Sequence, residues 1–127
     1  MTPQSFEHYF AHEARIAAQK DAQLQRHREH LTQQAATMTA VLSMLGARRI
    51  WVFGSVARGQ VRSASDLDMA VEGLPYAQDQ LLGIAEHVLQ HRVDLDLVPW
   101  EKAHPELRAR IVSEGRLVYE RESGTSE

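Results

Sequence analysis

The stretch that most constrains how this chain folds is residues 50–71, which read IWVFGSVARGQVRSASDLDMAV. Gly54 and Ser55 follow a run of β-forming residues, and Asp66 and Asp68 lie two positions apart in the next such run. Because side chains alternate between the two faces of a strand, both carboxylates should point the same way, away from the core. The stretch therefore predicts two strands, joined by a glycine turn, a short helix and a loop, with paired acidic groups on one face.

Two carboxylates on one face of a strand repel each other, which costs stability unless a ligand offsets the repulsion. Mg²⁺ is a suitable ligand, because it is commonly held by one or two carboxylates together with substrate phosphates. Gly54 lets the backbone approach a phosphate closely, and Ser55 is expected to cap the short helix that follows it. The pattern predicts a site for a nucleotide and a metal ion.

This pattern resembles the signature of the nucleotidyltransferase superfamily that includes DNA polymerase beta. In this chain Phe53-Gly54-Ser55 is followed by ten residues and then by Asp66-Leu67-Asp68-Met69. The longer string GSVARG…SDLD is similar to that of the minimal nucleotidyltransferases (MNT), small proteins that are often paired with a HEPN-domain toxin. The resemblance covers roughly residues 32–120, and the joint motif is far more specific than Gly-Ser or Asp-x-Asp alone.

The resemblance implies an α/β (α+β) fold with a small mixed sheet of about four strands, flanked by helices. It assigns residues 32–120 to the nucleotidyltransferase core, which leaves residues 1–31 as an N-terminal helical extension and residues 121–127 as a flexible tail. From the residue pattern we expect strands at 49–53, 66–71, 92–98 and 117–119, and helices at 76–90 and 105–114.

Residues 2–45 are expected to be helical, with Thr2 as the N-cap and Gly46 as the stop. Apolar residues recur every seven positions, but the middle of the segment, residues 19–34, is polar nearly all round. That middle part should be exposed or should contact a partner, and self-association through this helix is an open alternative. Histidine pairs at helical spacing, among them His27 and His30, are interpreted as solvated helix faces rather than zinc ligands.

A third carboxylate usually completes a site of this superfamily and helps to activate the acceptor hydroxyl. Asp94 and Asp96 compete for this role, since both are expected on the polar face of the strand at 92–98. The position of the later Pro105-Glu106-Leu107-Arg108 segment in the resembling family favours Asp96 and leaves Asp94 as the alternative.

The resemblance then implies a role for each site residue. Asp66, Asp68 and Asp96 would be catalytic and would hold the metal, with two Mg²⁺ ions expected. Gly54, Ser55 and Arg58 would bind the phosphates of ATP, the substrate. Arg58 has a second interpretation, as a surface arginine that balances the acidic pair.

The resemblance also implies a function: adenylyl transfer from ATP to a tyrosine of a HEPN-domain toxin, so that the protein acts as the antitoxin of a toxin–antitoxin pair. One alternative is an antitoxin that neutralises its partner by binding alone. Another is a nucleotidyltransferase that acts on a small molecule or on an RNA end.

Composition limits the partners and the cellular location that we expect for this chain. The net charge of −3 argues against stable nucleic-acid binding. The chain has no cysteine, so it has no disulfide framework, and it has no apolar run of the roughly 18 residues that a membrane span needs. We therefore expect a cytoplasmic protein without a membrane partner.

Overall fold

A computed structural model describes residues 3–62, 65–90 and 93–122, with side chains from residue 10 onward. Its elements, in chain order, are α1 (Pro3–Met44), β1 (Arg49–Phe53), α2 (Gly54–Ala57), β2 (Leu67–Glu72), α3 (Gln78–Leu89), β3 (Leu95–Pro99), the 3₁₀ turn η1 (Trp100–Lys102), α4 (Pro105–Glu114) and β4 (Arg116–Glu120).

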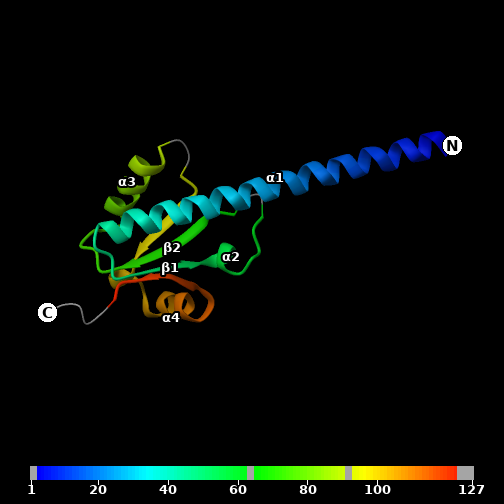
Figure 1. Cartoon of the computed structure of the whole chain (residues 1–127). Coiled ribbons are helices and arrows are strands. Elements are labelled where there is room, and N and C mark those ends of the chain that lie inside the picture. The colour runs from blue at the N-terminus through cyan, green and yellow to red at the C-terminus, as the bar shows by residue number, and fades with distance from the viewer. Residues whose placement is uncertain (1–2, 63–64, 91–92, 123–127) are drawn as a thin grey trace.

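The four strands form one mixed sheet in the order β3-β2-β1-β4 (Figure 1). β1 pairs antiparallel with both β2 and β4, whereas β2 pairs parallel with β3. The parallel pair is possible because α3 crosses back over the sheet between its two strands. The predicted fold class, a small mixed sheet flanked by helices with a long N-terminal helix, is confirmed.

Helices cover both faces of the sheet. α1 and α3 lie on one face, where they bury alternate residues of the strands, among them Ile50, Leu67 and Met69. α4 lies on the other face, where Ile111 packs against Trp51 and Phe53. Trp51 also stacks on Trp100, with ring centroids 4.4 Å apart, so one tryptophan packs in the core and the other at its rim.

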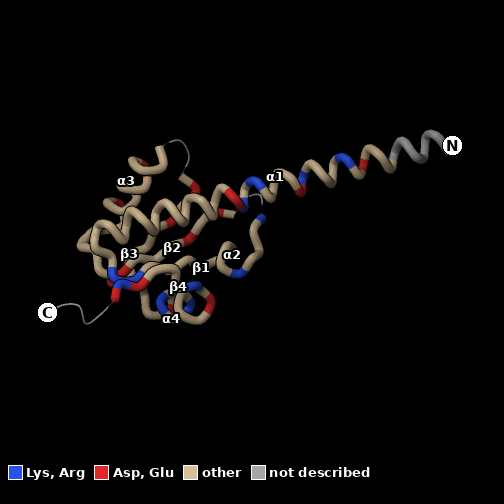
Figure 2. Tube along the Cα trace, in the orientation of Figure 1, with Lys and Arg blue, Asp and Glu red and all other residues tan. Residues whose placement is uncertain are grey.

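α1 is a single helix of 42 residues that crosses the expected boundary between residues 31 and 32 without a break. Its second half packs on the sheet through residues that include Leu31, Met38 and Leu42, and contact with the core begins at Leu24. Its first half projects away from the sheet (Figure 1), and its described part carries both basic and acidic residues (Figure 2). No helix in the described ranges is long and apolar enough to cross a membrane.

Some predicted boundaries shift. β2 begins at Leu67 rather than Asp66, and β3 begins at Leu95 within the strand expected at 92–98. The parallel ladder starts where the Leu67 N–H donates to the Asp94 carbonyl oxygen (2.7 Å), so both aspartates precede their strands. The predicted cap Thr2, the predicted strand start Arg92 and residues 123–127 of the predicted tail lie outside the described residues.

Candidate active site

The glycine turn brings backbone directly against a carboxylate. Gly54 follows β1 with a φ of +75°, a left-handed conformation that favours glycine. A Cβ atom at this position would overlap Oδ2 of Asp68. Glycine is therefore required both by the turn and by the carboxylate beside it.

Ser55 does not cap α2, contrary to the prediction. The N-cap position belongs to Phe53, no side chain caps the helix, and Ser55 is the second residue of its single turn. The turn closes so tightly after β1 that Gly54 is already helical, which moves Ser55 past the capping position. Its half-buried side chain still lies next to Gly54, in the turn that faces Asp68.

Asp68 and Asp96 are neighbours across the parallel strands. In the sheet register Asp68 is paired with Phe53 on one side and with Asp96 on the other. Burial and the nearby charges of Asp96 and Asp66 raise the pKa of the Asp68 carboxyl from 3.8 to about 6, while Arg58 lowers it. The structure thus brings together three of the predicted carboxylates and the predicted arginine.

Asp66 is exposed and lies just before β2. Its charge acts on Asp68 from the loop. Within the described part of the chain, no three His, Cys, Asp or Glu side chains converge closely enough to enclose a metal ion. Carboxylate oxygens are nevertheless the ligand type that Mg²⁺ prefers, and an incomplete protein set is usual where phosphates supply the remaining ligands.

The side chain of Asp94 contacts α1 rather than the other carboxylates. Its Oδ2 lies 3.2 Å from Nε2 of His30, a residue of α1, and α1 covers the face of the sheet opposite Asp68 and Asp96. The expectation that Asp94 and Asp96 share one face is therefore wrong, because Asp94 precedes the strand and does not follow its alternation. The solvated interpretation of His27 and His30 is also wrong, since each contacts a loop of the core.

Arg58 ends α2 and is partly exposed. Its Nη1 lies 3.4 Å from Oε1 of Glu114 in α4, and its Nε donates to the side chain of Gln60 (3.3 Å). Arg58 also lowers the pKa of Asp68, so it balances acidic groups, as one of the two interpretations made from the sequence expected. Its role in binding phosphate stays a prediction.

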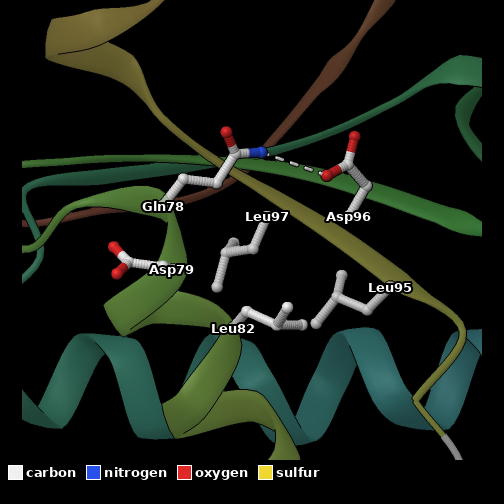
Figure 3. Close-up of a pocket in the computed structure, with 6 residues that line it drawn as sticks. All are labelled: Gln78, Asp79, Leu82, Leu95, Asp96 and Leu97. Atoms are coloured by element: carbon white, nitrogen blue, oxygen red, sulfur yellow. Dashed lines mark hydrogen bonds between the residues drawn. The ribbon is translucent and has the colours of Figure 1, made fainter.

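Gln78 is a neighbour of the site that the sequence did not reveal. It is the first residue of α3, and its Nε2 donates to Oδ1 of Asp96 (3.2 Å), as Figure 3 shows. Both residues line a cavity of about 440 Å³ at the β3 edge of the sheet, together with Asp79, Leu82, Leu95 and Leu97. No motif predicts this contact, because it depends on where α3 returns to the sheet.

The arrangement can be compared with known proteins. Residues 39–124 match the family model described as polymerase beta, nucleotidyltransferase. The chain belongs to this family. The match includes the glycine turn and all of the predicted site residues, although it begins after the projecting half of α1.

Solved structures agree with this nucleotidyltransferase fold. A protein assigned as a minimal nucleotidyltransferase is 31% identical, with a TM-score of 0.55, and the match covers 70% of this chain and 93% of that one. A chain of a toxin–antitoxin complex crystallised with AMP-PNP is 23% identical (TM-score 0.52; 67% of this chain, 74% of that one). A protein of Sulfolobus solfataricus assigned as a nucleotidyltransferase is 18% identical (TM-score 0.52; 80% and 91%). No protein of curated function matches significantly.

Proposed function

We propose that this protein is a Mg²⁺-dependent nucleotidyltransferase that transfers the adenylyl group of ATP to a tyrosine of a HEPN-domain toxin and so acts as an antitoxin. The observation that carries the proposal is the placement of Asp68. Its carboxylate lies against the Gly54 turn, beside Asp96, with a raised pKa that a bound cation would lower again.

The residues present fit a metal of this kind. Asp66, Asp68 and Asp96 offer oxygen ligands only, and the Gly54 turn leaves no Cβ to cover the Asp68 carboxylate. Mg²⁺ held by these carboxylates would screen the charge of the triphosphate and favour ionisation of the acceptor hydroxyl. Phosphate oxygens would supply the remaining ligands, which agrees with the absence of a closed ligand set among the described residues.

Each remaining residue then has a role in transfer. The backbone and hydroxyl of Ser55 would bind phosphate oxygens at the turn, and Arg58 would leave Glu114 to neutralise them. Asp96, held by Gln78, would accept the proton of the tyrosine hydroxyl. The phenolic oxygen attacks the α-phosphorus, a new P–O bond forms, and the bond to the β-phosphate breaks to release pyrophosphate.

The nucleotide and the partner are supported by similarity. The neighbouring toxin–antitoxin structure was crystallised with an ATP analogue. A HEPN toxin and MNT antitoxin are also the components named for another similar structure. Both statements concern those proteins, and they make ATP and a HEPN-domain partner the first substrates to test here.

The test is transfer of label from α-³²P-ATP in Mg²⁺ to the product of the neighbouring gene, the expected HEPN-domain partner. The wild type and Glu86→Ala, a control in an exposed carboxylate of α3, should label the partner, and Asp68→Ala should not. Label that appears equally with Asp68→Ala would refute the proposed site. Label on RNA or on a small molecule, with none on the partner, would refute the proposed acceptor.

Neutralisation by binding alone is a second candidate, and the projecting half of α1 favours it. In the described part of this arm, residues 10–23, most side chains are exposed, and Phe10 keeps 56% of its surface exposed. A chain that begins at Gln23 keeps Leu24 and the later residues of α1 that pack on the core. If binding alone neutralises, Asp68→Ala should still protect cells from the toxin and the shortened chain should not.

A further inference from the structure

Two histidines of α1 reach across to the loops that lead into the central strands. Nε2 of His27 lies 2.7 Å from the carbonyl oxygen of Ser65, and Nε2 of His30 lies 3.2 Å from Oδ2 of Asp94. A carbonyl oxygen can only accept a hydrogen bond, so Nε2 of His27 carries a proton and donates to Ser65. Nε2 of His30 lies between Oδ2 of Asp94 and Nε2 of Gln34 (3.1 Å), and its tautomer decides which of the two it bonds. The two rings also stack on each other, with centroids 6.3 Å apart.

The two loops are joined to each other as well. The N–H of Leu67 donates to the carbonyl oxygen of Asp94 (2.7 Å). The contacts therefore close a ring: from His27 to Ser65, along the chain to Leu67, across to Asp94, and back to α1 at His30. Asp66 lies inside this ring, between two residues whose backbone atoms are both held.

Asp66 needs such support because it precedes the ladder of β2. Asp68 is fixed by pairing with β1 and β3 on its two sides, whereas Asp66 is exposed in a loop. A ligand that is not held in place loses conformational freedom on binding the metal, and that loss weakens binding. Strand pairing does not restrain Asp66, because the residue precedes β2. The ring of contacts with α1 restrains it instead.

We propose that His27 and His30 are positioning residues, which hold the Ser65–Leu67 segment so that Asp66 is oriented for the divalent cation. This inference rests on the proposed function, because it assumes that Asp66 is a metal ligand. It gives Asp94 a positioning role within the ring in place of the ligand role that was its alternative. It also links α1, the helix that carries the projecting arm, to one half of the acidic pair.

Two substitutions at residue 27 separate hydrogen bonding from packing. His27→Gln keeps an N–H donor at a similar distance from the backbone but removes the ring. His27→Phe keeps the ring and its stacking on His30 but removes the donor. His87→Ala, at an exposed histidine of α3, is the control. Each variant is first tested for cooperative unfolding in urea.

The readout is Mn²⁺ binding in the presence of AMP-PNP, followed from the electron paramagnetic resonance signal of free Mn²⁺. His27→Phe should weaken Mn²⁺ binding about tenfold, the lower end of what loss of a supporting hydrogen bond costs in metal sites. His27→Gln and His87→Ala should bind as the wild type does. Varying Mg²⁺ in the transfer assay should raise the Mg²⁺ concentration for half-maximal rate in His27→Phe, with the rate at saturating Mg²⁺ largely retained.

Equal Mn²⁺ affinity in His27→Phe and the wild type would overturn the inference and leave the proposed function standing. Weak binding in His27→Gln with normal binding in His27→Phe would also overturn it, because that result assigns His27 a packing role. If His27→Phe does not fold, His30→Gln and His30→Phe repeat the comparison on the other side of the ring. A wild type that binds no Mn²⁺ with nucleotide would refute the proposed function, and this inference with it.

Discussion

Replacing Asp68 by asparagine should stabilise the metal-free protein at neutral pH. The pKa of Asp68 is raised in the fold because burial and the charges of Asp96 and Asp66 disfavour the carboxylate. A group whose pKa is raised on folding contributes stability below its unfolded pKa, here 3.8, and that contribution is lost as the pH rises through about 6. Above that range the wild type carries an unfavourable charge that Asp68→Asn lacks.

The size of the effect follows from the pKa. A change from 3.8 to about 6 corresponds to about 3 kcal/mol of unfavourable free energy once the group is fully ionised. Asp68 is only half-buried, so solvent screening reduces this figure, and we expect about 1–2 kcal/mol. No hydrogen bond to the Asp68 carboxylate is found among the described contacts, so the substitution removes charge without removing a known bond.

The measurement is urea unfolding of the wild type and Asp68→Asn at pH 7.5 and at pH 4.0, in EDTA. The variant should be more stable by about 1–2 kcal/mol at pH 7.5, and the difference should nearly vanish at pH 4.0. Mg²⁺ with AMP-PNP should then stabilise the wild type more than the variant. An Asp68→Asn protein that is equally stable or less stable than the wild type at pH 7.5 would refute the electrostatic reasoning.

Two further substitutions test the turn and the opposite end of β2. Gly54→Ala should lower the free energy of unfolding in urea by about 1–3 kcal/mol, because the residue has a φ of +75° and a Cβ would overlap Asp68. Gly83→Ala is the matched control. A Cβ at Gly83 meets nothing within 4 Å, so this variant should be as stable as the wild type or more stable. Glu72→Gln should destabilise the protein at pH 7, because the hydrogen bond with Arg49 lowers the pKa of Glu72 in the fold and so stabilises the folded state while Glu72 is ionised. This stabilisation disappears as Glu72 is protonated, so the difference in stability between the variant and the wild type should shrink as the pH falls below 4.5. An equal loss from Glu72→Gln at pH 7 and at pH 4 would contradict that assignment.

The central part of the site could be predicted from the sequence because its geometry is local. The glycine turn, the spacer and Asp68 all belong to one hairpin-like unit, whose two strands pair directly in the sheet. Strand alternation then places Asp68 beside its register partners, whichever way the helices pack. The register that places Asp96 beside Asp68 was not predicted. The preference for Asp96 over Asp94 came from family resemblance, and its role in the site stays a prediction.

The remainder could not be predicted, because it depends on how α1 and α3 lie on the sheet. The contact of Asp94 with His30 joins residues 64 positions apart, and the contact of Gln78 with Asp96 requires α3 to return to the β3 edge. His27 and His30 were noticed as a pair at helical spacing, but spacing does not reveal which helix face meets a loop. The capping error at Ser55 is of a different kind: the helix start lies two residues earlier than predicted, with Phe53 at the N-cap.

The two acidic residues of β2 that share a face show why Asp68 is unlike a structural carboxylate. Asp68 and Glu72 lie four residues apart on one strand, so their side chains point the same way. Nε of Arg49 donates to Oε1 of Glu72 (2.6 Å) and Nη2 to Oε2 (3.1 Å), and this contact lowers the pKa of Glu72. Asp68 instead has a raised pKa, because it is half-buried and lies beside two further carboxylates. The same strand therefore carries one carboxylate that the fold pairs with an arginine and one whose ionised form the fold disfavours. The second lies against the glycine turn, and a cation bound there would stabilise its ionised form.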